Sequence, residues 1–277
     1  MLLDENHDWM KPIEEGPWDI GFEQSYISLG GIQSPPYKFL RNGIFEGMDK
    51  EEGRPDIKLW NKGEHETPLG ITSVVKPGHG SSDWDSAAYN MILVNETQKF
   101  IDDHISNNEE KPFFTYVSLG SVHGPHSPPH EYTDGTPIAG QHGTLHLDIL
   151  SEMDKVVGSL VSILDQRQLT DDTIIIFTSD NGGINSLERS SEAIGHISNG
   201  HLRDGKGTIY EGGSRIPMTF RWDKMIPKGE RRSSHFVGLN DIYATLCDLV
   251  GIKKLNEFQA VDSISFANYI LNSTATR

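Results

Sequence analysis

Apolar and polar positions form regular patterns from Ser82 onward, and these patterns predict two long helices. From Ser82 to Ser106 apolar residues recur mostly every three or four positions, as in an amphipathic helix, and Ser82 is a suitable N-cap. A second apolar face extends from about Thr144 to Gln168. Its members are Leu145, Ile149, Leu150, Met153, Val156, Val157, Leu160, Val161 and Leu164. Each helix is therefore expected to pack one face on a core.

Three short apolar runs predict strands at 113–119, 174–177 and 216–222. The order strand, helix, strand from 113 to 177 is typical of a right-handed βαβ unit with parallel strands. A short helix is expected after Asn240 as its N-cap, with Gly251 ending it. The predicted fold class is α/β: a mostly parallel β-sheet flanked by helices, incomplete at the N-terminus.

The first 81 residues show no sustained periodicity and are rich in glycine and proline. Scattered aromatic residues indicate ordered loops, and one explanation is that this segment packs against a part that is missing from the chain. We expect a single domain over 1–277, with an irregular segment at 1–81 and a helix and strand core at 82–277.

Polar side chains gather where the predicted strands end. Asp180 and Asn181 directly follow the strand at 174–177, and His123 and His126 lie in the loop after the strand at 113–119. Because parallel strands end at the same edge of a sheet, all four residues are expected on one side. A carboxylate beside an amide oxygen suits a hard cation such as Ca²⁺, although Asp-Asn-Gly-Gly is also an ordinary turn sequence.

Lys206 lies between two glycines, which allow close approach of the backbone to a ligand. A metal, a lysine and a histidine together suit ester cleavage at sulfur or phosphorus. Simpler interpretations stay open: Lys206 can be solvated, and Arg203 can pair with one of the many acids. His123 and His126 could instead form a zinc pair. His142 and His146, four residues apart near a helix start, would also fit a metal or simply flank a helix cap.

Composition narrows the classes of partner. The formal net charge is −16, which argues against nucleic acid and anionic membranes as partners. The single cysteine, Cys247, excludes an internal disulfide, and its helical apolar context indicates a core residue. No apolar run approaches the length of a transmembrane helix, and the polar first residues are unlike a signal peptide.

Six blocks resemble, in order, the arylsulfatase family of the alkaline phosphatase superfamily. They are FFTYVSLGSVHGPHSPP, DILSEMDKVVGSL, IIIFTSDNGG, SNGHLRDGKGTIYEGGSRIP, DIYATLCDLVGI and AVDSISF. The resemblance implies that Asp180 and Asn181 are calcium ligands and that His123 and Lys206 contact the sulfate. It further implies that His126 and Arg203 lie beside the substrate, a sulfated small molecule or carbohydrate.

The resemblance also implies a formylglycine, made from Cys or Ser in a Cys/Ser-x-Pro-x-Arg motif that this sequence does not contain. We therefore expect an N-terminally truncated sulfatase with little activity alone. Two alternatives stay open: a non-catalytic anion-binding or interaction module, and a related phosphatase or phosphodiesterase. With strands missing, self-association through an exposed sheet edge is expected. The family resemblance implies a periplasmic, secreted or lysosomal location.

Overall fold

The computed structural model describes residues 8–63, 65–66, 72–73, 76–107, 110–184, 194–226, 229, 236–252 and 258–271. These residues form two compact units. The first comprises Met1–Ile163 with Ile184–Gly200, and the second comprises Leu164–Gly183 with His201–Arg277. The units interleave along the chain, and a single domain over 1–277 stays a prediction.

The segment expected to be irregular contains short antiparallel sheets between its loops. Strands β1 (Tyr26–Ser28), β2 (Phe39–Arg41) and β3 (Ile44–Phe45) form one sheet in that order, and β4 (Ile57–Trp60) pairs with β7 (Gly78–Ser81). The strands β5 (His65–Glu66) and β6 (Thr72–Ser73) form a further pair. Strands of two to four residues are too short to leave a readable alternation in the sequence.

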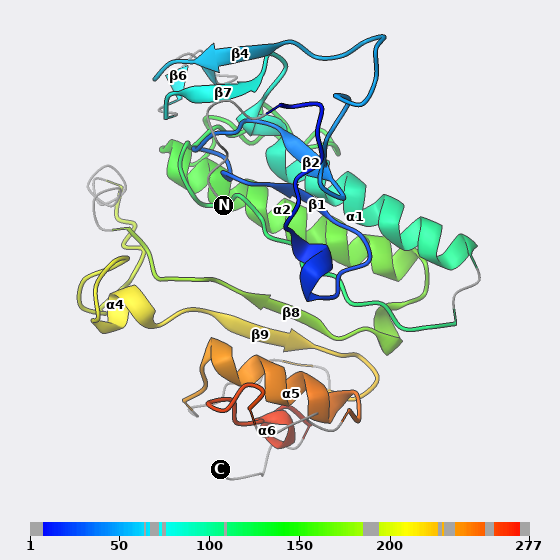
Figure 1. Cartoon of the computed structure of the whole chain (residues 1–277). Coiled ribbons are helices and arrows are strands. Elements are labelled where there is room, and N and C mark those ends of the chain that lie inside the picture. The colour runs from blue at the N-terminus through cyan, green and yellow to red at the C-terminus, as the bar shows by residue number, and fades with distance from the viewer. Residues whose placement is uncertain are drawn as a thin grey trace. The chain divides into compact units, whose positions relative to one another are not determined.

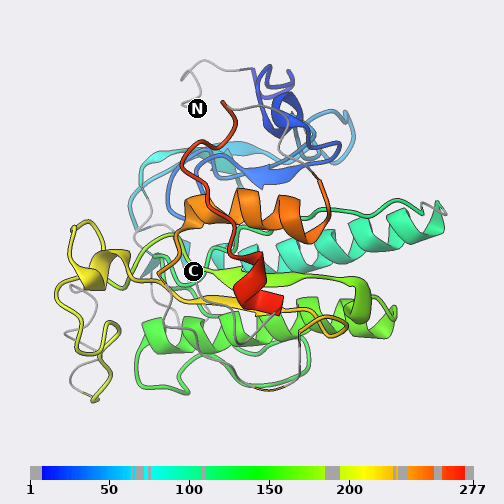
Figure 2. The same ribbon diagram turned by 90° about the horizontal axis from the view of Figure 1, so that it is seen from below.

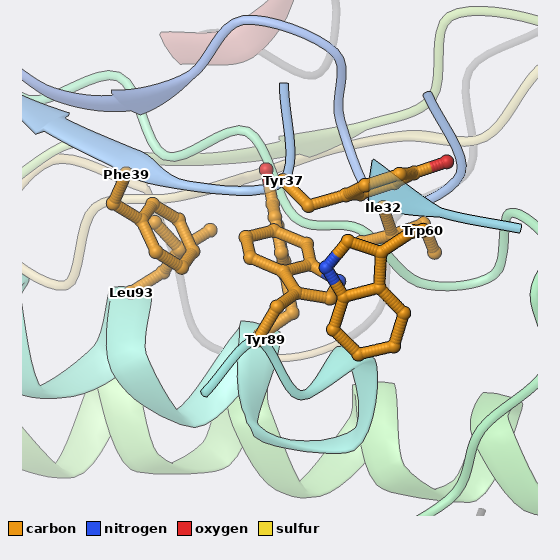
Figure 3. Close-up of a cluster of buried hydrophobic side chains, with 7 residues drawn as sticks. Ile32, Tyr37, Phe39, Trp60, Tyr89 and Leu93 are labelled. Atoms are coloured by element: carbon orange, nitrogen blue, oxygen red, sulfur yellow. The ribbon is translucent and has the colours of Figure 1, made fainter. Parts of the chain in front are cut away.

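An aromatic core joins these strands to the first long helix. Phe39 on β2 packs against Tyr89 and Trp84, with ring centroids 5.1 and 5.4 Å apart. Figure 3 shows Tyr89 and Leu93 projecting from the helix toward the side chains above it. Tyr37, which is 0% exposed, donates its hydroxyl to Gln33 O at 2.8 Å. The first 81 residues therefore carry part of the hydrophobic core of this unit.

Both long helices form where the apolar pattern predicts them, with shifted N-terminal ends. A 3-10 turn at Ser86–Ala88 leads into α1 (Tyr89–Ser106), and α2 extends over Leu145–Gln166 (Figure 1). Ser82 is not the cap of the first helix: Asp85 accepts a hydrogen bond from Ala87 N at 2.8 Å instead. The two helices run in nearly the same direction in both views (Figure 2).

The predicted βαβ unit with parallel strands does not form in the described residues. Residues 112–120 have no ladder partner, and Phe114 and Tyr116 are 63% and 75% exposed. The strand β8 (Ile175–Thr178) pairs antiparallel with β9 (Met218–Arg221). An apolar run becomes a strand only where a neighbour satisfies its backbone groups, and the described residues offer 113–119 none. Self-association through the unpaired edges stays a prediction.

The second unit packs short helices near the β8–β9 pair. It contains 3-10 turns at Thr170–Asp172 and Leu239–Asp241 and the helices α4 (Glu211–Ser214), α5 (Ile242–Leu249) and α6 (Ala267–Leu271). The rings of Phe220 on β9 and Phe266 before α6 lie 5.5 Å apart. Cys247, expected in the core, is only partly buried in α5.

The end of α5 was predicted correctly and its beginning was not. Gly251 follows the helix with φ +74°, the left-handed backbone conformation in which glycine commonly ends an α-helix. Asn240 is not its cap: Asp241 occupies the N-cap position, and the side-chain amide of Asn240 donates to Asp262 O at 2.7 Å. In the part of the chain that the structure describes, no helix is long and apolar enough to span a bilayer.

Candidate functional site

His123 lies in a tight turn of the first unit. Its backbone N–H donates to Gly120 O at 2.9 Å, and its Nδ1 lies 2.7 Å from Gly124 O. The side-chain nitrogen of Gln33 lies 3.0 Å from Nδ1 and 3.4 Å from Nε2. The ring is thus held in one orientation and exposed to solvent.

His126 begins a row of three imidazoles in the same unit. Its Nε2 lies 3.2 Å from Val122 O and 3.4 Å from Nδ1 of His146, near the start of α2. The His146 ring lies 6.4 Å from that of His196. Burial, with a smaller contribution from His146, lowers the pKa of His126 to about 4. Burial and His196 also lower the pKa of His146. These two rings are therefore neutral at pH 7.

The low pKa of His126 predicts a loss of stability in acid. The ring has a pKa of about 6.5 in the unfolded chain and about 4 in the folded chain. Its contribution is fully present above pH 6.5 and is lost as the pH falls toward 4, because the unfolded chain then binds the additional proton. We expect His126→Asn to reduce the pH dependence of the free energy of unfolding between pH 7 and pH 4.5 by about 2 kcal/mol. Urea denaturation at both pH values measures it.

A matched control separates this effect from general acid sensitivity. His130 is an exposed histidine four residues further along the same loop, and His130→Asn should leave the pH dependence as in the wild type. Equal pH dependence in the wild type and the His126→Asn variant would show that the folded protein does not hold this ring neutral.

Buried polar side chains of α2 hold the long loop that carries these histidines. The carboxylate of Asp148, which is 1% exposed, accepts hydrogen bonds from the backbone N–H groups of Gly140, Gln141 and His142 at 2.8, 3.0 and 2.8 Å. Two turns further along, Lys155 donates to Asp134 at 2.9 Å. The second helix therefore serves as the scaffold of the loop over residues 120–142.

Asp180 and Asn181 follow β8 in the second unit. Asp180 is exposed, and no described residue donates a hydrogen bond to its carboxylate. The side-chain amide nitrogen of Asn181 donates to Gly182 O at 3.0 Å, which leaves its amide oxygen available. The pair thus offers oxygen atoms from adjacent side chains at the end of a strand.

Glycines bring the Lys206 loop against the loop after β8. A Cβ on Gly182 would lie 1.8 Å from Gly212 O, and a Cβ on Gly212 would lie 1.9 Å from Asp204 O. Gly182 N donates to Gly213 O at 3.0 Å, and Lys206 N donates to Gly183 O at 2.7 Å. Three backbone segments are packed directly on one another, and we call this arrangement the glycine junction: residues 180–183, 203–208 and 210–214.

The basic side chains of the glycine junction differ in their contacts. The guanidinium of Arg203 lies 3.7 Å from the centre of the Tyr210 ring, a cation–π contact. Lys206 is exposed, and no described acidic side chain pairs with it. Lys206 therefore carries its exposed ammonium on a loop whose backbone contacts Gly183, two residues after Asn181.

The expected calcium ligands fit part of a calcium site. Calcium takes 6–8 oxygen ligands, and carboxylate and amide oxygens are suitable ones. Asp180 and Asn181 supply such oxygens, and further ligands are needed. Across the described ranges, no group of three or more His, Cys, Asp or Glu side chains could hold a metal ion. Among the described residues, neither the possible zinc pair His123 and His126 nor the possible metal pair His142 and His146 therefore has a third ligand.

The sequence-predicted residues thus fall into two groups. His123 and His126 belong to the first unit, whereas Asp180, Asn181, Arg203 and Lys206 belong to the second. Within each group the structure brings the predicted residues together. A common edge for both groups stays a prediction.

Comparison with known proteins places the chain in a family. An α/β protein with a basic, glycine-rich loop of this kind is consistent with many hydrolases. The family model described as Sulfatase matches residues 33–252, and the chain belongs to that family. Its solved relatives share the α/β fold, which confirms the predicted fold class.

Individual relatives cover the chain to different extents. An N-acetylgalactosamine-6-O-sulfatase of Bacteroides thetaiotaomicron is 30% identical over 97% of this chain and 55% of its own length. Human steryl-sulfatase is 34% identical over 53% of this chain and 24% of its own length. The chain spans about half the length of the first of these relatives.

Two solved structures extend the comparison. One, from work on glycosaminoglycan metabolism by Bacteroides thetaiotaomicron, superposes with a TM-score of 0.77 and 27% identity, over 96% of this chain and 58% of that one. Another, a complex with a neocarrahexaose, has a TM-score of 0.54 and 30% identity, over 73% of this chain and 42% of that one.

Sequence reasoning missed Gln33 and the buried acids of α2. Gln33 contacts His123 across 90 positions, and nothing in its local sequence indicates this. Asp148 and Glu152 do carry a signal. They stand four residues apart, next to the buried Ile149 and one turn before the buried Val156, so both lie on the face that the apolar pattern buries. A charged residue on the buried face of a helix needs partners and is a candidate for a special role.

Proposed function

We propose that this chain forms part of a site that binds and cleaves sulfate esters of carbohydrates. The observation that carries the proposal is the glycine junction, which places the Lys206 loop in backbone contact with the loop of Asp180 and Asn181. Membership of the Sulfatase family supports the reaction class. The carbohydrate names of an N-acetylgalactosamine-6-O-sulfatase relative and of a neocarrahexaose complex support the substrate class.

Each residue of the proposed site has a role that follows from its chemistry. The ammonium of Lys206 neutralises charge on the non-bridging oxygens of the sulfate. His123, when protonated, delivers a proton to the leaving oxygen. His126 and Arg203 contact the rest of the substrate. Calcium, when bound by Asp180 and Asn181 with further ligands, would add positive charge beside the same oxygens.

A second candidate function rests on the absence of the nucleophile motif. The 277 residues contain no Cys/Ser-x-Pro-x-Arg, and the single cysteine lies in α5. This favours an anion-binding module when the chain is taken alone. Both functions use the same junction, and they differ in turnover. We expect the isolated chain to bind sulfate and to hydrolyse no aryl sulfate.

The test of the proposal is stabilisation by calcium. We expect a calcium concentration of about ten times the dissociation constant to stabilise the chain by about 1.4 kcal/mol and to raise its Tm by about 3 °C. Asp180→Ala should abolish the shift because it removes a carboxylate ligand. Thermal unfolding with and without calcium, followed by circular dichroism, measures it.

Matched variants sharpen this test. Asp262 is an exposed acid of the same unit outside the glycine junction, so Asp262→Ala should keep the calcium shift. In a calorimetric titration with inorganic sulfate, Lys206→Ala should weaken binding at least fivefold. Lys224→Ala, which removes only an exposed partner of Asp172, should not. A wild-type chain that responds to neither calcium nor sulfate would refute the proposed function.

A further inference from the structure

Glu152 is a buried acid with an unusual environment. It lies on α2 and is 1% exposed, and its Oε1 is buried without a hydrogen-bond partner. No ion pair described in the structure involves this carboxylate. Burial raises the pKa of Glu152, and hydrogen bonds from Ser121 and Asn90 oppose the rise. Burying a carboxylate without a cation beside it costs folding free energy, and this cost indicates a role for the groups that Glu152 contacts.

The carboxylate belongs to a closed network of three side chains. Its Oε2 accepts from Asn90 Nδ2 at 2.9 Å and from Ser121 Oγ at 3.0 Å. Asn90, on α1, is 4% exposed and also contacts Ser121 Oγ at 2.5 Å. One residue from each helix and one from the loop are thereby tied together.

This network is connected to His123 by one residue. The Oδ1 atom of Asn90 accepts from Gly120 N at 2.9 Å, and Gly120 O accepts from His123 N at 2.9 Å. Gly120 lies against the aromatic core with no room for a side chain, because a Cβ there would lie 2.8 Å from Ile32 and 2.9 Å from Tyr89. The backbone that begins the histidine turn is therefore fixed on both sides, by side-chain hydrogen bonds and by the aromatic core.

We propose that Glu152, acting through Asn90 and Ser121, is a positioning residue for His123. The inference rests on the proposed function, in which His123 serves the sulfate, and it names what fixes that histidine. Without an acceptor at position 152, Asn90 and Ser121 lose their common partner and Asn90 is free to rotate away from Gly120. The turn from Gly120 to His123 then opens more often, and the imidazole samples several orientations.

The experiment compares three variants of helix α2 in the whole chain. Glu152→Leu keeps the volume and removes the acceptor, whereas Glu152→Gln keeps one acceptor oxygen in place. Val156→Ala is the structural control: Val156 is 0% exposed one turn further along, and its truncation leaves a cavity without touching the network. Hydrogen exchange of the peptide over 119–124 and the imidazole resonances of His123 are recorded for each variant.

We expect Glu152→Leu to raise the exchange rate of that peptide at least tenfold and to broaden or shift the His123 resonances. Glu152→Gln should stay within threefold of the wild type, and Val156→Ala should leave both readouts unchanged under conditions where it remains folded. Equal changes in Glu152→Leu and Val156→Ala would show that helix packing, and not the hydrogen-bond network, fixes the loop, and would overturn the inference. An unchanged loop in Glu152→Leu would overturn the inference.

Sulfate titration of the same proteins keeps the two proposals distinguishable. If the wild type binds sulfate, Glu152→Leu should weaken that binding while Val156→Ala should not. If the wild type binds no sulfate, the proposed function fails, and the exchange and resonance data still decide whether Glu152 positions His123.

Discussion

Alanine in place of Gly182 is expected to lower the free energy of unfolding by about 3 kcal/mol or more. The new Cβ would stand 1.8 Å from Gly212 O and 2.9 Å from its carbonyl carbon, both backbone atoms that no side-chain rotation can move. The loops must separate, which breaks the 3.0 Å bond from Gly182 N to Gly213 O and strains the 2.7 Å bond from Lys206 N to Gly183 O. Urea denaturation of the variant and the wild type measures the difference.

A second glycine provides the control for this prediction. Gly158 is exposed in the middle of α2, with no atom within 4 Å of the position of an added Cβ. Gly158→Ala should therefore stabilise the chain by about 0.5–1 kcal/mol through helix propensity. If Gly182→Ala were as well tolerated as Gly158→Ala, the backbone packing of the glycine junction would be wrong.

The same substitution bears on function. A Gly182→Ala protein that remains folded should lose sulfate affinity, because the loop of Lys206 can no longer lie against the loop of Asp180 and Asn181. Gly182 of the DNGG segment and Gly212 and Gly213 of the EGGS segment are therefore required by contact between backbones. This contact is a reason for glycine at these positions beyond the turn propensity of Asp-Asn-Gly-Gly.

The helices were predictable because each depends on a repeating local pattern. The second helix ends within two residues of its expected bounds, and it has enough turns for the apolar face to be unambiguous. Nothing in the local sequence of residues 113–119 indicates that this segment does not form a strand. Its apolar and β-branched residues satisfy every local criterion, and only the absence of a ladder partner in the described residues leaves it unpaired.

The antiparallel pairing of β8 with β9 is a similar case. Local sequence indicated two strands and their approximate ends, and the direction of pairing depends on long-range chain path. The short strands of the first 81 residues could not be predicted because they lack a local pattern. Their core is built from single aromatic residues separated by turns, such as Tyr37, Phe39 and Trp60, which no periodic template detects.

The candidate site shows the same division between local and long-range information. Asp180, Asn181 and Lys206 were found from residue type and flanking glycines, and backbone hydrogen bonds within one unit connect their loops. The supports of His123 could not be found in this way. Gln33 and Asn90 reach their partners across 90 and 31 positions, and a polar residue gives no local sign of so distant a partner.

Replacing Asp148 with alanine is expected to destabilise the chain by about 3 kcal/mol. The carboxylate accepts from three consecutive backbone N–H groups, at residues 140–142, and its Oδ1 also lies 3.2 Å from Nδ1 of His142. Alanine leaves these donors without an acceptor beside a buried helix face. The loop would exchange its bonds for water only by moving off α2, so hydrogen exchange over 139–143 should rise together with the loss of stability.

Two substitutions on the same helix separate this anchoring from charge alone. Asp148→Asn keeps one acceptor oxygen and should recover part of the stability, on the order of half. Asp154→Ala removes an exposed acid six residues further along and should change the free energy of unfolding by less than about 0.5 kcal/mol. If Asp148→Ala matched Asp154→Ala, the loop would not depend on this carboxylate. If the expected order holds, the buried acids of α2 fix the loop of the candidate histidines at one end through Glu152 and at the other through Asp148.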